Sequence, residues 1–286
     1  MANLKDLRSR ITSVSSTMQI TSAMKMVSAA KLSRAQDAIT AMRPYSEKLT
    51  ELLQSLSATL DDDTSSKFSE EREVNNVLIV AISSNRGLAG AFNTNIVKGV
   101  RNVIAAKYSN KNVQLLTIGK KANDVLRKTY NVTENNNAIY DNLDFENVSV
   151  IAEAIMQGFL DGKYDKVELV YNQFVNAATQ NIMTEQFLPI QKFETDSNIT
   201  LDYIYEPSKL EIVKDLIPKS LKMQVFKAMS DSLASEHGAR MTAMHKATDN
   251  ATELRDALKL SYNKARQAAI TNEILEIVGG AEALNN

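Results

Sequence analysis

The stretch MHKATDNATELRDALKLSYNKARQA, residues 244–268, repeats apolar or small side chains at alternating intervals of three and four residues. The repeat consists of Met244, Ala247, Ala251, Leu254, Leu258, Ser261, Ala265 and Ala268. This spacing is typical of the buried seam of a coiled coil. Because alanine and serine are frequent in it, a second helix axis can approach closely. We therefore expect residues 208–286 to form a long helix that pairs with another helix.

A similar repeat opens the chain, in residues 1–60. Its apolar positions are Leu4, Leu7, Ile11, Val14 and Met18, and a change of phase through Ile20, Met24 and Val27 is predicted to follow. Each end helix needs a partner for its apolar stripe, and the simplest partner is the other end helix, packed antiparallel. The predicted seam contains Leu7, Ile11, Val14, Met24, Ala251, Leu254, Leu258 and Ala265.

The middle of the chain, residues 74–200, has a different pattern. A short β-branched apolar run at 77–82 predicts a buried strand, further strands are predicted at 113–118, 167–175 and 182–190, and helical spacing occurs at 93–107 and 148–160. Strands that alternate with helices indicate a layered domain with a largely parallel sheet. The fold class predicted is therefore α/β with long helices: an antiparallel coiled coil of the two end helices plus a central Rossmann-like globular domain.

The composition excludes several classes of protein. The formal net charge is -1, so the chain has no overall basic field for nucleic acid. There are no cysteines, which excludes a disulfide framework, a thiolate nucleophile and a thiolate metal site. No apolar run reaches 18 residues, and no secretory signal follows Met1, so we expect neither a transmembrane segment nor a signal peptide.

Motifs that could support chemistry are weak. Gly87 and Gly90 lie between a predicted strand and a helix, where phosphates often bind, but neither the dinucleotide fingerprint nor the P-loop is present. A tight turn is the simpler interpretation. His237 and His245 lie eight positions apart on one helix, which misses the spacing of helical metal ligands. We expect no catalytic residue, no metal site and no cofactor.

The last residues are apolar nearly all round the helix, from Ile274 through Ile277 and Val278 to Leu284. A two-helix pair buries only one stripe of each helix, so it cannot cover such a surface. This end is therefore predicted to insert into another protein.

Three segments resemble the gamma subunits of F-type ATP synthases of bacterial type. They are RITSVSSTMQITSAMKMVSAAKLSRAQ (residues 10–36), SSNRGLAGAFN (83–93) and nearly all of 234–284. Ala89 stands where many members of that family have cysteine, and the cysteine-containing regulatory insert of the chloroplast members is absent.

The resemblance implies the function of a central rotating shaft. In that family the coiled coil lies on the axis of a ring of alpha and beta subunits, and the globular foot sits on the epsilon subunit and the ring of c subunits. Ion flow through the c ring is thereby coupled to ATP synthesis or hydrolysis at beta-subunit sites. The shaft itself is not catalytic. It is peripheral, at the cytoplasmic face of the bacterial cell membrane, and reaches the membrane only through the c ring.

The resemblance also implies roles for individual positions. Contacts that act as a catch on a beta subunit are expected at Arg266, Gln267, Thr271, Glu273 and Glu276. A smooth bearing tip is expected at Ile277, Val278, Ala281 and Leu284, and a foot facing the c ring and epsilon at Tyr203, Tyr205 and Glu206. Two other classes stay open at this point: a coiled-coil scaffold with an α/β ligand-binding module, and a nucleotide-dependent enzyme that uses the turn at Gly87–Gly90.

Overall fold

The computed structural model describes residues 4–57, 67–190 and 209–285. Two helices dominate these residues. Helix α1 (Leu4–Ser57) has 54 residues and helix α5 (Lys209–Asn285) has 77. Both are several times longer than the roughly 11-residue helix usual in globular proteins. The prediction of a long helix at each end of the chain is confirmed.

The elements between them alternate as the sequence pattern predicted. Strand β1 (Asn76–Ile82) is followed by helix α2 (Phe92–Lys107), strand β2 (Asn112–Ile118) and the short helix α3 (Lys120–Leu126). Strand β3 (Asn131–Asn135) and helix α4 (Phe145–Leu160) come next, then strands β4 (Lys166–Phe174) and β5 (Gln180–Leu188). Two 3-10 turns, η2 (Lys67–Ser69) and η3 (Ala138–Asp141), complete the described elements.

The strands form one sheet in the order β3-β2-β1-β4-β5. The pairs β1/β2, β1/β4 and β2/β3 are parallel, and β5 adds an antiparallel edge to β4. The largely parallel sheet is therefore confirmed. Strand β3 was not predicted, because its sequence NVTEN carries no apolar run and it lies at a polar sheet edge.

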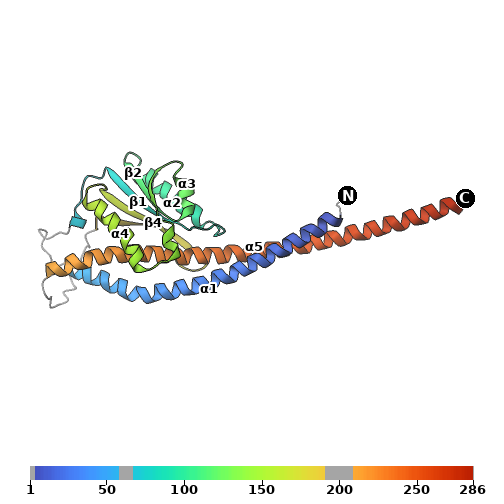
Figure 1. The fold of residues 1–286 in the computed structure, drawn as a ribbon, viewed down its shortest axis with the longest axis horizontal. Coiled ribbons are helices and arrows are strands. Elements are labelled where there is room, and N and C mark those ends of the chain that lie inside the picture. The colour runs from blue at the N-terminus through green and yellow to red at the C-terminus, as the bar shows by residue number, and fades with distance from the viewer. Residues whose placement is uncertain (1–3, 58–66, 191–208, 286) are drawn as a thin grey trace. The chain divides into compact units, whose positions relative to one another are not determined.

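Each face of the sheet is covered by helices (Figure 1). Helices α2 and α3 bury one face around Ile79, Ile96 and Leu115. Helix α4 and part of α5 bury the other, which includes Phe159, Tyr171 and Val225. Strand β1 lies in the middle, and its last six residues are buried, which explains why this strand reads as a continuous apolar run.

The chain divides into two compact units. One comprises residues 1–28 and 241–286, and the other residues 29–240. This grouping cuts across both end helices, whereas the sequence pattern divided the chain at the ends of those helices. The sheet, helices α2–α4 and residues 209–240 of α5 all belong to the second unit.

In the first unit, α1 and α5 pair in antiparallel directions (Figure 1). The hydroxyl of Thr248 donates a hydrogen bond of 2.8 Å to the hydroxyl of Thr21, and Arg255 contacts the sulfur of Met18. Position numbers rise along α5 while they fall along α1, as antiparallel helices require.

The seam of this unit differs from the prediction in one respect. The expected change of phase after Met18 does not occur: Ile20 and Val27 are 59% and 57% exposed, while Thr21 and Ser28 are buried. The alternation of three and four therefore continues through polar residues. An apolar pattern could not detect them, because a threonine or serine in a helix can satisfy its hydroxyl on a carbonyl one turn back, as both do here.

Candidate functional site

The predicted seam residues lie mostly on the buried stripes of the first unit. Leu7 and Ala251 are buried, and the others that the structure places on the stripes are half-buried: Ile11, Val14, Met24, Leu258 and Ala265. Leu254 is a correction, since its side chain is 52% exposed. Arg255 occupies the seam at that height with its contact to Met18. The aliphatic part of the Arg255 side chain can pack on apolar surface. A search for apolar residues does not count an arginine, so it selected the neighbouring Leu254 instead.

The end of helix α5 is uncovered in the described chain. Every residue from 270 to 281 is exposed. Among them are Ile274, Ile277 and Val278, with 54%, 72% and 51% of their surface accessible. A Cβ placed on Gly279 or Gly280 would meet nothing within 4 Å. This apolar helix end is a surface of the kind that marks a contact with another protein.

The predicted catch residues lie on the same segment. The structure exposes Arg266, Gln267, Thr271, Glu273 and Glu276. The hydroxyl of Thr271 donates to the carbonyl of Gln267, which is a bond within the helix. Of the predicted bearing tip, Ile277, Val278 and Ala281 are exposed, and the side chain of Leu284 is outside the described set. The predicted foot residues Tyr203, Tyr205 and Glu206 lie outside the described residues.

A second candidate site lies in the other unit, at the carboxyl ends of β1 and β4. The strand order reverses there, because β2 and β4 lie on opposite sides of β1. In open α/β sheets this crevice is the usual place for a nucleotide or another ligand. The turn with Gly87 and Gly90 begins here, immediately after β1, so the position suits the weak phosphate-binding motif of the sequence.

Helix α5 fills this crevice. The hydroxyl of Ser235 donates to the carbonyl of Asn172 at 3.0 Å, and both residues are buried. A Cβ on Gly238 would lie 3.1 Å from the Cα of Ala177 and 3.4 Å from the Phe174 ring, so the helix packs directly on the chain that follows β4. Ala239 is buried against Ala89 and Phe92 on the other side.

The turn after β1 is also closed by its own hydrogen bonds. The Ser84 hydroxyl donates to the carbonyl of Arg86 at 2.6 Å, and the Ser84 amide donates to the Asn93 side chain at 3.0 Å. The hydroxyl of Tyr140 donates to the carbonyl of Ser83 at 2.7 Å. Burial raises the pKa of this tyrosine well above its ordinary value, so the proton needed for the bond stays in place.

A cluster of charged side chains on α5 contacts the same turn. Arg240 donates to the carboxylate of Glu236 at 2.6 Å and reaches the carbonyls of Arg86 and Gly87 at 3.3–3.4 Å. Burial raises the pKa of Glu236, opposed by the charge of Arg240. Burial, together with the charge of Arg240, lowers the pKa of His237 to about 4, so this imidazole is neutral near pH 7. His237 is thus a buried packing residue.

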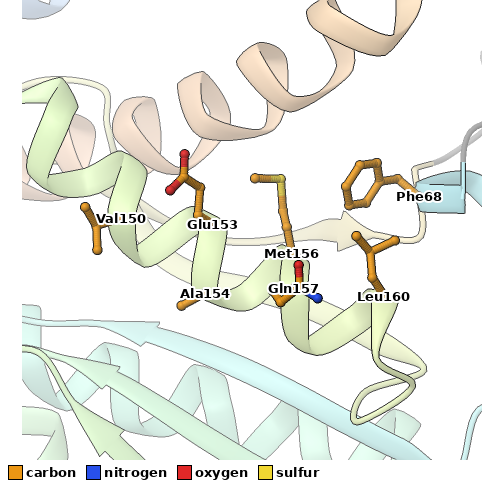
Figure 2. Close-up of a pocket in the computed structure, with 7 residues that line it drawn as sticks. All are labelled: Phe68, Val150, Glu153, Ala154, Met156, Gln157 and Leu160. Carbon is orange, nitrogen blue, oxygen red and sulfur yellow. The ribbon is translucent and has the colours of Figure 1, made fainter.

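A shallow pocket runs along helix α4, and Figure 2 shows its lining. Glu153 and Met156 point toward α5, and Glu153 pairs there with Lys222. The rest of the lining is mainly apolar: Phe68, Val150, Ala154, Gln157 and Leu160. Its carboxylate already has a partner, so the pocket offers little for the polar recognition of a small ligand. In residues 4–57, 67–190 and 209–285, no cluster of three or more His, Cys, Asp or Glu is arranged to hold a metal ion.

The chain is similar to known proteins over nearly its whole length. The family model described as ATP synthase matches residues 3–284. The ATP synthase gamma chain of Christiangramia forsetii is 76% identical, with all of both chains covered, and that of Flavobacterium psychrophilum is 67% identical, with 99% of each covered. Among solved structures, a chain of the Euglena gracilis mitochondrial ATP synthase, in a structure of its OSCP, F1 and c-ring parts, is similar with a TM-score of 0.70. That match has 25% identity and covers 98% of this chain and 94% of the other.

Proposed function

The chain belongs to the ATP synthase gamma chain family, and from that premise we propose that it is the central rotating shaft of an ATP synthase and performs no chemistry itself. The shaft couples ion flow through the c ring to the beta-subunit catalytic sites. Its partners are the alpha and beta subunits, the epsilon subunit and the c ring. It is held at the cytoplasmic face of the cell membrane through the c ring. Within the described residues, no helix is both long and apolar enough to cross a bilayer.

The observation that carries this proposal is the uncovered apolar end of α5, next to the segment that pairs with α1 in the first unit. Ile274, Leu275 and Ile277 are each more than half exposed. Burying a large aliphatic side chain is worth about 1.5–3 kcal/mol, so this helix end favours a site inside another protein. The axis of an alpha–beta ring provides such a site.

The filled crevice supports the non-catalytic part of the proposal. In a nucleotide-dependent α/β enzyme the switch point must be open to its ligand. Here Ser235, Gly238 and Ala239 pack into it, and a nucleotide could enter only if α5 left the sheet. The same packing disfavours the alternative of a scaffold with an α/β ligand-binding module.

We propose that Arg266 and Gln267 are the main catch contacts on a beta subunit, with Thr271, Glu273 and Glu276 continuing the polar surface. Exposed side chains are free to bond a partner in a defined direction, and a hydrogen bond to a charged group contributes about 1.5–3 kcal/mol. The smooth tip at Ile277, Val278, Ala281 and Leu284 allows rotation because apolar contacts are not directional.

The test is the double variant Arg266→Ala/Gln267→Ala in the assembled enzyme. ATP-driven turnover and proton pumping should both fall, while the complex still assembles. Glu253→Ala/Lys259→Ala is the matched control, because both side chains are exposed on the same helix. Wild-type turnover in the Arg266/Gln267 variant would contradict the catch. Steady ATPase activity of the purified single chain would contradict the non-catalytic assignment.

A further inference from the structure

We infer that Arg240 is a positioning residue: it locks the exposed turn Arg86–Leu88 to helix α5, so that force applied to the turn passes into the helix. The inference rests on the proposed shaft function for its mechanical meaning. The lock is tested by hydrogen exchange in the turn, and its mechanical meaning by the pumping ratio.

The turn is unusual in what it exposes. Leu88 is 64% exposed although it is a large apolar residue, and Arg86 beside it is exposed as well. The backbone of Leu88 has φ of 62°, a left-handed conformation that a leucine rarely adopts. A non-glycine residue stays in such a conformation only when its surroundings hold it there.

The surroundings hold the turn from two sides. On the sheet side, the Ser84 hydroxyl donates to the carbonyl of Arg86, and Asn93 accepts from the Ser84 amide. On the helix side, one guanidinium reaches two carbonyls. Nη2 of Arg240 lies 3.3 Å from the carbonyl oxygen of Arg86, and Nε and Nη2 both lie 3.4 Å from that of Gly87. Arg240 thus spans the two peptide groups that immediately precede Leu88.

The guanidinium is itself fixed in place. Its Nη2 donates to Glu236 at 2.6 Å, one turn earlier on the same helix, and its Nη1 lies 3.5 Å from Nδ1 of His237. As whole residues, all three are at most 8% exposed. A buried planar group with several fixed bonds has little freedom to reorient. A lysine at this position could not span both carbonyls and the carboxylate in the same way.

The turn and α5 also interact through the charges of Arg86 and Glu236, and a small apolar cluster lies next to the turn. Ala89 packs on Ala239 and Phe92 in the adjacent cluster. Such contacts resist compression but offer little resistance to sliding, because they have no preferred direction. Among the hydrogen bonds described here, those of Arg240 give the connection between the turn and the helix a defined direction. A partner that pushes on Arg86 or Leu88 would otherwise deform the turn instead of moving α5.

The experiment measures the turn directly in the assembled ATP synthase. Hydrogen exchange of the amides of residues 86–90 is compared between wild type and Arg240→Met, which keeps a long side chain but removes every donor. We expect exchange in the turn to rise at least tenfold, while the amides of β1 and α4 keep their wild-type protection. Arg101→Met on the exposed surface of α2 is the matched control and should leave all of these amides unchanged.

The transmission of force from the turn to α5 is measured as the number of protons pumped per ATP hydrolysed. Arg240→Met should lower this ratio at least twofold while ATP hydrolysis continues, and Arg101→Met should not change it. Unchanged exchange in the turn, or an equal rise throughout the sheet, would overturn the lock. A loosened turn with an unaltered pumping ratio would overturn its mechanical role. Failure of the wild-type chain to assemble with alpha and beta subunits would instead count against the proposed function.

A second variant covers the case in which Arg240→Met does not assemble. Glu236→Gln keeps the size and an acceptor oxygen but loses the charge that fixes the guanidinium. We expect about threefold faster exchange in residues 86–90, and the pumping ratio should fall in the same direction. Identical exchange in Glu236→Gln and wild type would overturn the claim that Glu236 holds the lock.

Discussion

The glycine that joins β2 to α3 provides the sharpest test of the packing at the carboxyl ends of the strands. Gly119 has φ of 102°, and a Cβ placed on it would lie 2.2 Å from the carbonyl oxygen of Ser83. The blocking atom belongs to the backbone, so no rotamer change can relieve the contact. We predict that Gly119→Ala is among the most destabilising single substitutions in this domain.

The magnitude follows from two contributions. The backbone conformation costs an alanine about 1–3 kcal/mol. The oxygen must also withdraw by about 1 Å to reach ordinary contact at 3.4 Å. That movement withdraws the acceptor from the Tyr140 hydroxyl, which bonds it at 2.7 Å, and disturbs the bond from the Ser83 amide to the Ile118 carbonyl at 2.8 Å. Leaving such buried groups unpaired costs about 1–3 kcal/mol each, so with the backbone contribution we expect a total loss of about 3–9 kcal/mol.

Two other glycines separate these contributions. Gly162 has φ of 74°, but a Cβ there meets only Arg72 at 3.9 Å, so Gly162→Ala should cost only the left-handed backbone, about 1–2 kcal/mol. Gly87 has neither a positive φ nor a close neighbour, its nearest atom being a Lys121 carbon at 3.7 Å. Gly87→Ala should therefore change stability by less than about 0.5 kcal/mol.

The assay is urea-induced unfolding of the purified chain, followed by tyrosine fluorescence, since the chain has no tryptophan. The urea concentration at the midpoint of unfolding should be the same for Gly87→Ala and wild type. It should be lower for Gly162→Ala and lowest for Gly119→Ala. If Gly119→Ala unfolds at the same urea concentration as Gly162→Ala, the contact with Ser83 does not constrain the fold and the reasoning is refuted.

Three further predictions address single contacts. NMR of the imidazole signals of the chain's two histidines should show His237 titrating near pH 4. The histidine of the unfolded chain takes up its proton near pH 6.5, so this residue lowers the stability of the fold as the pH falls from 6.5 to 4. A titration midpoint near pH 6.5 would contradict the burial of His237. Thr21→Val or Thr248→Val alone should lower the free energy of unfolding by about 1 kcal/mol, measured by chemical unfolding. The double variant should lose less than the sum of the two, because neither hydroxyl is then left without the other. Strict additivity would show that the two hydroxyls do not interact. Tyr108→Phe removes the 2.6 Å bond to the buried carboxylate of Glu168, whose second oxygen has no partner within the described structure, and should cost about 1.5–3 kcal/mol in thermal unfolding; an unchanged melting temperature would argue against that bond.

The sequence pattern predicted the elements whose residues are buried on both sides or along one stripe. Strand β1 carries a continuous apolar run, β2 and β4 are largely apolar, and the end helices carry repeats of three and four, so these elements were predictable from the pattern. Strand β3 was not predicted because it pairs at a sheet edge through its backbone, and Val132 is its only apolar residue. The phase of the seam was wrong after Met18, because buried Thr21 and Ser28 bond their own helix and do not count as apolar.

The site at the carboxyl ends of the strands was only partly predictable. The turn with Gly87 was found from its position after a strand, and the absence of a fingerprint favoured a structural turn. The partner of that turn, Arg240, lies about 150 positions later, and no local spacing connects the two. A signal existed in the pair Glu236 and Arg240, one helical turn apart, but on a long helix such a pair is usually exposed and contributes little. Burial against the sheet gives it a different role, and burial depends on tertiary structure.

The core of the sheet has a consequence for the order of biosynthesis. One face of the sheet is covered by Leu221, Val225 and Met229, which the ribosome adds after every strand is complete. In the first unit the N-terminal segment of α1 is made first, but its partner, residues 241–285 of α5, is made last. A nascent chain therefore carries Leu7, Ile11 and Val14 without their cover for almost the whole of translation. Contacts between such distant parts of a chain form slowly, and exposed apolar surface favours aggregation in the meantime. This protein should depend on protection by chaperones until residues 241–285 have been made, and a truncation that removes this segment should leave the apolar stripe of residues 4–28 exposed and prone to aggregation.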